Sequence, residues 1–282
     1  MSQNWGRWGA DDEVGALNHI TDERRRKAAG LVKQGRVVSL ARPLKLGDVT
    51  KGHDSLRRIE MDDGFLGAAT ECLQLEYHGD EITHIDSLGH IWDSGGMWGG
   101  KDPDRMIQAD GLSWGAIDAW REGIVTRGVL LDVVRHRGVD YVESSAPVTG
   151  NELDEIARKQ QVDVTVGDAV AVHCGREAWV AAGRPGHSAP GLDPSCVDFL
   201  SARECTALLW DQNEITRADG QPRTLPVHSV IWRLGMAVID GAKLDELADV
   251  CQERNTYEFM LVTAPLPIIG GSGSPVNPLA LL

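Results

Sequence analysis

The sequence predicts an α/β fold built as a single domain, and three observations support this prediction. Segments with strand and helix character alternate along the chain, most clearly between residues 149 and 210. A chain of 282 residues is long enough to bury a large core. No internal repeat or low-complexity linker divides it. We therefore predict one domain over residues 1–282, with residues 1–20 as an N-terminal arm.

The N-terminal part of the chain predicts a helix and two strands around a polar loop. Thr21 is a suitable N-cap for a helix that extends to about Lys33. Branched and apolar residues at 37–44 predict a strand, and the charged segment 45–63 predicts a surface loop. A second strand is expected at residues 72–77, and it leads into a segment rich in histidine.

The C-terminal part predicts further alternation of helices and strands. Leu153, Ile156 and Ala157, for example, have helical spacing. We also expect His228 at the start of a helix within residues 226–240. In chain order, the remaining pattern predicts a helix at 117–122, a strand at 125–134, a helix at 149–160, a strand at 169–173, a helix at 194–203, a strand at 205–210, a helix at 244–251 and a strand at 257–263.

The composition excludes several classes of protein. A net charge of −14 argues against a nucleic-acid partner, because phosphate binding depends on clusters of Lys and Arg. No apolar run approaches the roughly 20 residues that a membrane span needs. Five scattered cysteines predict no disulfide framework, and the first residues do not resemble a secretory signal. We therefore expect a cytoplasmic protein with no nucleic-acid partner and no membrane partner.

A histidine-rich segment at residues 78–90 predicts a metal site. His84 and Asp86 are two residues apart, so a strand would point both side chains to one face. At about 3.3 Å per residue their Cα atoms would lie roughly 6.6 Å apart, a separation that one ion can bridge. The alternative interpretation is that these histidines belong to the core or the surface and cluster without a ligand.

Other residues of this segment reach the ion only if the chain bends. In an extended strand, Asp80 and His78 would lie roughly 13 and 20 Å from His84. Gly79 offers a place for a bulge or turn. The glycine before His90 similarly lets that residue fold back over the metal. Of the three histidines, His78 is the one least expected to bind the ion.

Tryptophans near the segment suggest a substrate pocket. Trp92 and Trp98 follow it in a glycine-rich loop and could form the flat apolar wall of a small-molecule site. They could equally anchor the loop to the core. Trp8, in the N-terminal arm, could line a pocket or a partner subunit, or it could pack on its own domain.

The segment resembles a known family signature. Thr83-His84-Ile85-Asp86-Ser87-Leu88-Gly89-His90 is similar to the core of the H-x-G-T-H-x-D-x-x-x-H motif of the cyclase family. That family includes kynurenine formamidases, isatin hydrolases and trans-dienelactone hydrolases. The resemblance covers most of the chain, because it continues at residues 8–18, 226–228, 233–236, 265–267 and 273–278.

This resemblance implies a swivelling β/β/α-type fold with a mixed sheet and flanking helices. It also implies a divalent metal, manganese or zinc, and a homodimer or homotetramer. His84 and Asp86 match metal ligands of the family, and His90 matches its catalytic histidine. The first ligand histidine of the family is Asp80 here, and Ile82 replaces a glycine. A carboxylate at that position would favour a harder ion such as manganese.

In the family, a downstream histidine and glutamate complete the site. Glu204 falls about where that glutamate is expected, as a second catalytic residue. His187 is the nearest histidine, in a loop rich in glycine and proline that we expect close to the substrate.

The resemblance implies a hydrolase of an amide, lactam or lactone bond in a small cyclic or aromatic substrate. The metal would be held by Asp80, His84 and Asp86, with His90 as the general base for an activated water. Two alternatives stay open. One is a lyase or dehydratase that uses the same metal. The other is a metal-poor binding protein of this fold, suggested by the replacements at Asp80 and Ile82.

Overall fold

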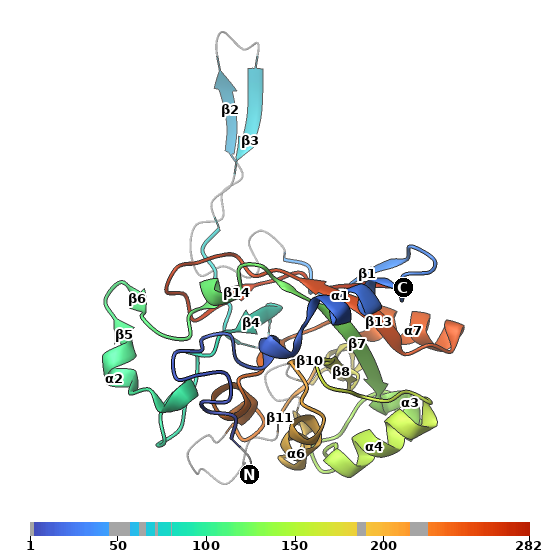
Figure 1. Ribbon diagram of the computed structural model, residues 1–282. Coiled ribbons are helices and arrows are strands. Elements are labelled where there is room, and N and C mark those ends of the chain that lie inside the picture. Colours follow the sequence, from blue (N-terminus) through green and yellow to red (C-terminus); the bar gives the residue numbers. More distant parts are fainter. Residues whose placement is uncertain are drawn as a thin grey trace.

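A nine-stranded mixed sheet forms the centre of the computed structural model (Figure 1). The structure describes residues 3–44, 57–61, 66–70, 73–79, 81–184, 190–214 and 225–282. In spatial order the strands are β1 (Val37–Ser39), β15 (Leu279–Leu281), β13 (Glu258–Thr263), β7 (Ile124–Asp132), β8 (Ala169–His173), β10 (Ala207–Trp210), β12 (Ala237–Asp240), β4 (His84–Asp86) and β14 (Gly273–Pro275).

Four neighbouring strands, β7, β8, β10 and β12, run parallel, and the strands outside them pair antiparallel. Parallel strands covered on both faces consist of nearly continuous apolar residues, and β8 is buried along its whole length. Their carboxyl ends meet at one edge of the sheet. Polar residues gather there: Asp132, His173, Asp211 and Asp240 end or follow these four strands.

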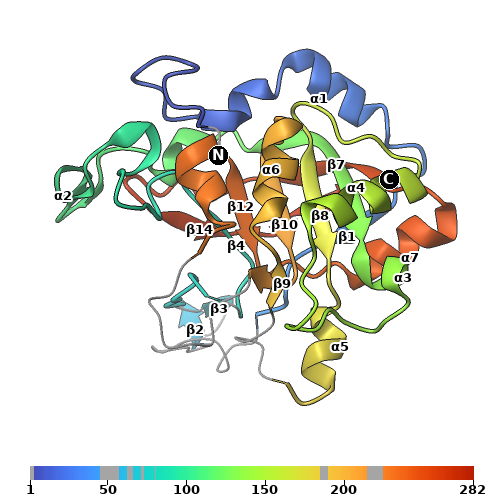
Figure 2. The same ribbon diagram turned by 90° about the horizontal axis from the view of Figure 1, so that it is seen from below.

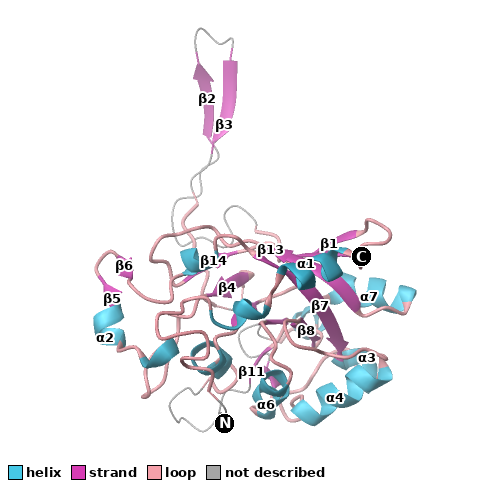
Figure 3. Cartoon of the chain, in the orientation of Figure 1, coloured by secondary structure: helices cyan, strands magenta, loops and turns pink. Residues whose placement is uncertain are grey.

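Helices lie around this sheet, as Figures 2 and 3 show. α1 packs on β7 and β13, and α4 packs on α6 and β7. None of the helices in the described ranges is long and apolar enough to cross a membrane. The helices are α1 (Asp22–Ala29), α2 (Pro103–Met106), α3 (Val133–Arg137), α4 (Gly150–Lys159), α5 (Arg176–Ala181), α6 (Ser195–Ala202) and α7 (Asp245–Arg254).

The predicted α/β fold, with a mixed sheet and flanking helices, is confirmed. Thr21 caps α1 as expected, because its side chain accepts a hydrogen bond from the backbone N–H of Arg24 at 3.3 Å. The helix ends at Ala29, before the predicted Lys33. The strand predicted at 169–173 matches β8 residue for residue.

Three local predictions are wrong. The described part of the strand expected at 72–77, residues 73–77, has no regular structure. Residues 57–61, expected in a loop, form β2 (Arg57–Met61). This strand pairs with β3 (Leu66–Thr70) in a hairpin that extends away from the sheet (Figure 1). Residues 237–240 form β12, a strand not predicted, where a helix beginning at His228 was expected; only one helical turn, Val230–Leu234, precedes it.

The N-terminal arm packs on its own chain. The indole N–H of Trp5 donates to the carbonyl of Trp232 at 2.5 Å, and the N–H of Ala16 donates to the carbonyl of Gly235 at 2.7 Å. Gly15, with φ of 66°, approaches Gly235 so closely that a Cβ would collide with that carbonyl. Of the alternatives for the arm, the structure thus places it against the body of the same chain.

Candidate metal centre

The pair His84 and Asp86 lies on β4, between β12 and β14, and each side chain is 1% exposed. His84 Nε2 is 3.5 Å from Asp86 Oδ1, so the predicted strand geometry for this pair is confirmed. His84 Nδ1 lies 2.8 Å from the carbonyl of Ile82 and donates to it. The Nε2 lone pair is therefore free to face Asp86 and bind a cation.

His78, the histidine least expected to bind the ion, joins this pair because the chain bends before β4. Its Nδ1 is 3.0 Å from Asp86 Oδ1, and its ring centroid is 5.2 Å from that of His84. The reason is that β4 begins only at His84, and the chain before it folds back instead of continuing as a strand. Ser272 fixes the ring from the other side, because its Oγ is 3.0 Å from His78 Nε2. His78, His84 and Asp86 together could hold a metal ion.

Asp86 also belongs to a second group, with His228 and Asp240, that could hold an ion. His228 Nε2 is 3.2 Å from Asp240 Oδ2 and 4.0 Å from Asp86 Oδ2. The register of β12 against β4 places Asp240 opposite His84. Glu214 orients His228, since its carboxylate is 2.5 Å from Nδ1 and leaves Nε2 toward the two aspartates.

His90 lies beside this cluster and is partly exposed. Its ring stacks on His78 with a centroid distance of 3.9 Å and an interplanar angle of 5°. Its Nε2 is 3.8 Å from Asp86 Oδ1, and its side chain is 25% exposed. Burial lowers the pKa of His90 more than the nearby Asp86 charge raises it. His90 is therefore neutral near pH 7 and reaches both solvent and the cluster.

The electrostatics of the second group favour a cation. Burial alone would lower the pKa of His228, but Asp240 and Glu214 outweigh it and raise that pKa well above its ordinary value. Burial by itself would raise the pKa of the Asp240 carboxyl, but the charge of His228 and its hydrogen bond outweigh burial and lower that pKa. Asp86 Oδ2 is buried and accepts no hydrogen bond from any described residue. A metal ion would satisfy this oxygen and balance the buried carboxylates, so the residues present fit one.

The structure does not bring Glu204 to this cluster. Glu204 precedes β10 and pairs with Arg7. The cluster lies at the opposite end of the strand, where the indole N–H of Trp210 donates to Asp240. Asp80 and His187, predicted as ligand and pocket residues, lie outside the described residues.

The three predicted pocket tryptophans have different surroundings. Trp98 is 2% exposed, its indole N–H donates to the carbonyl of Asp12 at 2.8 Å, and it anchors its loop to the core. Trp8 lies against Trp98 and His19. Trp92 is 38% exposed.

Three residues of the cluster were missed in the sequence: His228, Asp240 and Glu214. His228 lies in a segment that resembles the family, but nothing in the sequence around it identified it as a metal ligand. Asp240 ends the short apolar run Ala-Val-Ile at 237–239. A run this short does not distinguish a strand from a buried helical segment, so no local signal identified Asp240 as a ligand.

A separate charged cluster surrounds His173 at the same edge of the sheet. Its Nδ1 is 3.1 Å from Asp132 Oδ1, and its Nε2 lies 3.8 Å from Asp211 and 3.7 Å from Asp245. Burial by itself would lower the pKa of His173, but these carboxylates outweigh it and raise the pKa to about 10. The imidazolium thus forms ion pairs with carboxylates at the ends of β7 and β10 and at the start of α7, from its own position at the end of β8.

This raised pKa predicts a loss of stability at alkaline pH. An unfolded chain releases the same proton near pH 6.5. The stabilisation by His173 is therefore complete below about pH 6.5 and is lost as the pH rises to about 10. We expect the free energy of unfolding to fall over this range by on the order of 3 to 5 kcal/mol more in the wild type than in His173→Gln. Urea denaturation of both proteins between about pH 6.5 and 10 would measure this difference. The prediction would be contradicted if the free energy of unfolding had the same pH dependence in the wild type and in His173→Gln.

Comparison with known proteins gives the following relationships. The family described as Putative cyclase matches residues 15–215. No curated protein matches the chain. A crystal structure described as a novel cyclase is 28% identical, covers 100% of both chains and has a TM-score of 0.86.

Two further solved structures share the fold at lower identity. Isatin hydrolase A from Ralstonia solanacearum is 21% identical, with 93% of this chain and 97% of that chain covered and a TM-score of 0.59. A predicted metal-dependent hydrolase from Bacillus stearothermophilus is 16% identical, with 88% and 98% covered and a TM-score of 0.52.

Proposed function

Because this chain belongs to the Putative cyclase family, we propose that it is a metal-dependent hydrolase of an amide, lactam or lactone bond in a small cyclic substrate. The observation that carries the proposal is Asp86. This buried carboxylate is shared by two groups of potential ligands, and its Oδ2 has no protein partner among the described residues. The fold shared with isatin hydrolase A and with a predicted metal-dependent hydrolase supports the same class.

The residues that would hold the ion are His78, His84 and Asp86, with Asp240 and His228 at the adjoining position. Imidazole and carboxylate ligands suit both zinc and manganese. Asp80 stays a predicted further ligand. When bound, a divalent cation supplies positive charge that lowers the pKa of a water molecule and polarises a carbonyl oxygen.

The chain's own residues would move the proton. His90 is neutral, partly exposed and 3.8 Å from Asp86 through its Nε2. It is placed to accept a proton from the attacking water and to donate it to the leaving nitrogen or oxygen. His84 and His228 are placed as ligands instead, because both are buried and turn Nε2 toward the carboxylates of the cluster.

Metal depletion tests the proposal. The purified protein would be treated with a chelator, then restored with zinc or manganese, and assayed against an aryl formamide, a lactam and a lactone. We expect chelation to remove at least about 99% of the hydrolysis of one substrate and metal to restore it. Mass spectrometry should show that the product has gained one water.

Two results would contradict the proposal. One is less than about 0.2 equivalents of any transition metal after metal-supplemented purification, together with turnover that a chelator does not change. The other is a product that has gained no water, which would assign the site to a lyase or dehydratase.

A further inference from the structure

A short glycine-rich run at residues 270–273, close to the C-terminus, lies beside the candidate metal centre. β14 begins at Gly273 and pairs with β4, where Gly273 lies opposite Asp86. One residue earlier, the carbonyl of Ser272 accepts a hydrogen bond from the N–H of Ser87 at 3.0 Å. The backbone of this run is thus held in register with the strand that carries the buried ligand pair.

His78 is the potential ligand that most needs support from elsewhere in the chain. It lies in a segment without regular structure, and its side chain is 28% exposed, whereas those of His84 and Asp86 are each 1% exposed. Burial therefore does not fix the ring of His78 as it fixes that of His84. A side chain that is free to change rotamer loses entropy when it binds an ion, and this loss lowers the affinity.

Ser272 and Gly273 give His78 this support. Ser272 Oγ is 3.0 Å from His78 Nε2. The ring lies so close to the backbone of Gly273 that a Cβ there would be 2.8 Å from His78 Cε1. Tyr77 lies 4.6 Å from the ring and donates its hydroxyl hydrogen to the Gly273 carbonyl, while His90 stacks on the ring at 3.9 Å. These contacts leave the ring one orientation.

This orientation selects the nitrogen of His78 that faces the ion. Donation from Nε2–H to Ser272 Oγ leaves the lone pair on Nδ1, which is 3.0 Å from Asp86 Oδ1. His84 presents the other nitrogen, since its Nε2 is 3.5 Å from the same oxygen. Ligand atoms of one zinc ion lie roughly 3.3 Å apart when each bond is about 2.0 Å long, so both separations fit.

We propose that Ser272 and Gly273 are positioning residues that hold His78 for binding of the ion through Nδ1. The C-terminal run then determines the metal affinity of a site whose other ligands lie on β4. This inference rests on the metal site of the proposed function. It goes beyond that function because it assigns a role to residues that do not contact the ion.

Zinc affinity tests this role without any substrate, by competition of the full chain with a chromogenic chelator. Ser272→Ala should weaken zinc binding by about 10- to 100-fold, the usual effect of losing a residue that orients a ligand. Ser272→Thr keeps the hydroxyl and should stay within about 3-fold of the wild type. Gly273→Ala should also weaken binding by at least about 10-fold, because its Cβ displaces the ring.

A double-mutant cycle shows whether Ser272 acts through His78. In a His78→Ala background, Ser272→Ala should weaken zinc binding by less than about 2-fold, because no ring remains to be positioned. Binding stays measurable in this background, since Asp86 keeps its second group of ligands. An equal loss in both backgrounds would mean a general structural role and would overturn the proposal, as would unchanged affinity in Ser272→Ala.

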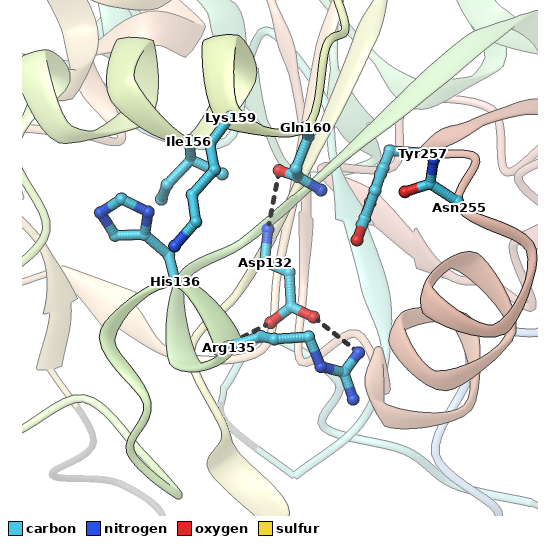
Figure 4. A pocket seen from close by; sticks show the side chains of 8 residues that line it. All are labelled: Asp132, Arg135, His136, Ile156, Lys159, Gln160, Asn255 and Tyr257. Carbon is cyan, nitrogen blue, oxygen red and sulfur yellow. Dashed lines mark hydrogen bonds and ion pairs between the residues drawn. The ribbon is translucent and has the colours of Figure 1, made fainter.

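Two controls remove the same groups elsewhere. Ser145→Ala removes an exposed hydroxyl. His136→Ala removes an imidazole from a cavity of about 160 Å³ at the end of β7, whose eight lining residues include no member of either ligand group (Figure 4). Both variants should bind zinc as the wild type does. Thermal unfolding would show that each variant is folded before titration.

The ligand nitrogen is a further readout. Long-range proton–nitrogen NMR spectra of the zinc-loaded chain should show one histidine bound through Nδ1, and its absence would overturn the proposal. If the wild type binds less than about 0.2 equivalents of metal, the proposed function fails together with this inference. If the wild type and Ser272→Ala bind a full equivalent equally well, only the role of Ser272 and Gly273 fails.

Discussion

Replacing Asp86 by asparagine is expected to lower metal content below about 0.1 equivalents and hydrolytic activity by at least about 10³-fold. The effect is large because this carboxylate contributes to both groups of ligands, so no second site remains intact. Asparagine keeps the shape of the side chain and removes its charge, which separates loss of the ion from loss of the fold. Elemental analysis and steady-state kinetics on the same preparation would measure both effects.

Asp198→Asn is a suitable control for this experiment. Asp198 is exposed on α6 and belongs to neither ligand group, so metal content and activity should match those of the wild type. If Asp86→Asn retained a full equivalent of metal, the ligand assignment for β4 would be wrong.

Replacing His90 by glutamine is expected to lower kcat by about 10² to 10⁴-fold while the metal content stays at the wild-type level. His90 belongs to neither ligand group, yet its Nε2 is 3.8 Å from Asp86, where a general base could reach an attacking water. Glutamine can form hydrogen bonds at this position but cannot take up a proton near pH 7.

The pH profile provides the second measurement for His90. Because burial lowers the pKa of His90, the base stays unprotonated below pH 6.5, and activity should persist there in the wild type. The acid limb of kcat/KM should disappear in His90→Gln. A variant that loses its metal would instead show that His90 is a ligand, and a variant with wild-type kcat would exclude it as the base.

Short-range geometry explains which parts of the site could be predicted from the sequence. His84 and Asp86 are separated by one residue, and the two-residue period of a strand is enough to place them together. His90 follows four residues after Asp86, close enough that a turn returns it to the same cluster. Parallel strands such as β8 were predictable for a similar local reason, since full burial requires an unbroken apolar run.

Long-range pairing explains what the sequence could not provide. Asp240 enters the site through the register of β12 against β4, and no local pattern specifies that register. His228 is positioned by a single helical turn before β12 and by Glu214. His78 was the histidine least expected to bind, because the sequence allowed a bend at Gly79 but could not show that the chain makes it. Glu204 has the expected spacing along the sequence but lies at the wrong end of its strand.

The position of β4 between β12 and β14 also has a consequence for the order in which the protein matures. Both neighbours of this strand, Ala237–Asp240 and Gly273–Pro275, are translated long after His84 and Asp86 have left the ribosome. Pairings this distant in sequence have a high loop-closure entropy and form late. During translation the edges of β4 stay open, and a chaperone that covers a bare strand edge would protect it from aggregation. The two groups of potential ligands around Asp86 are therefore complete only after β12 has paired with β4.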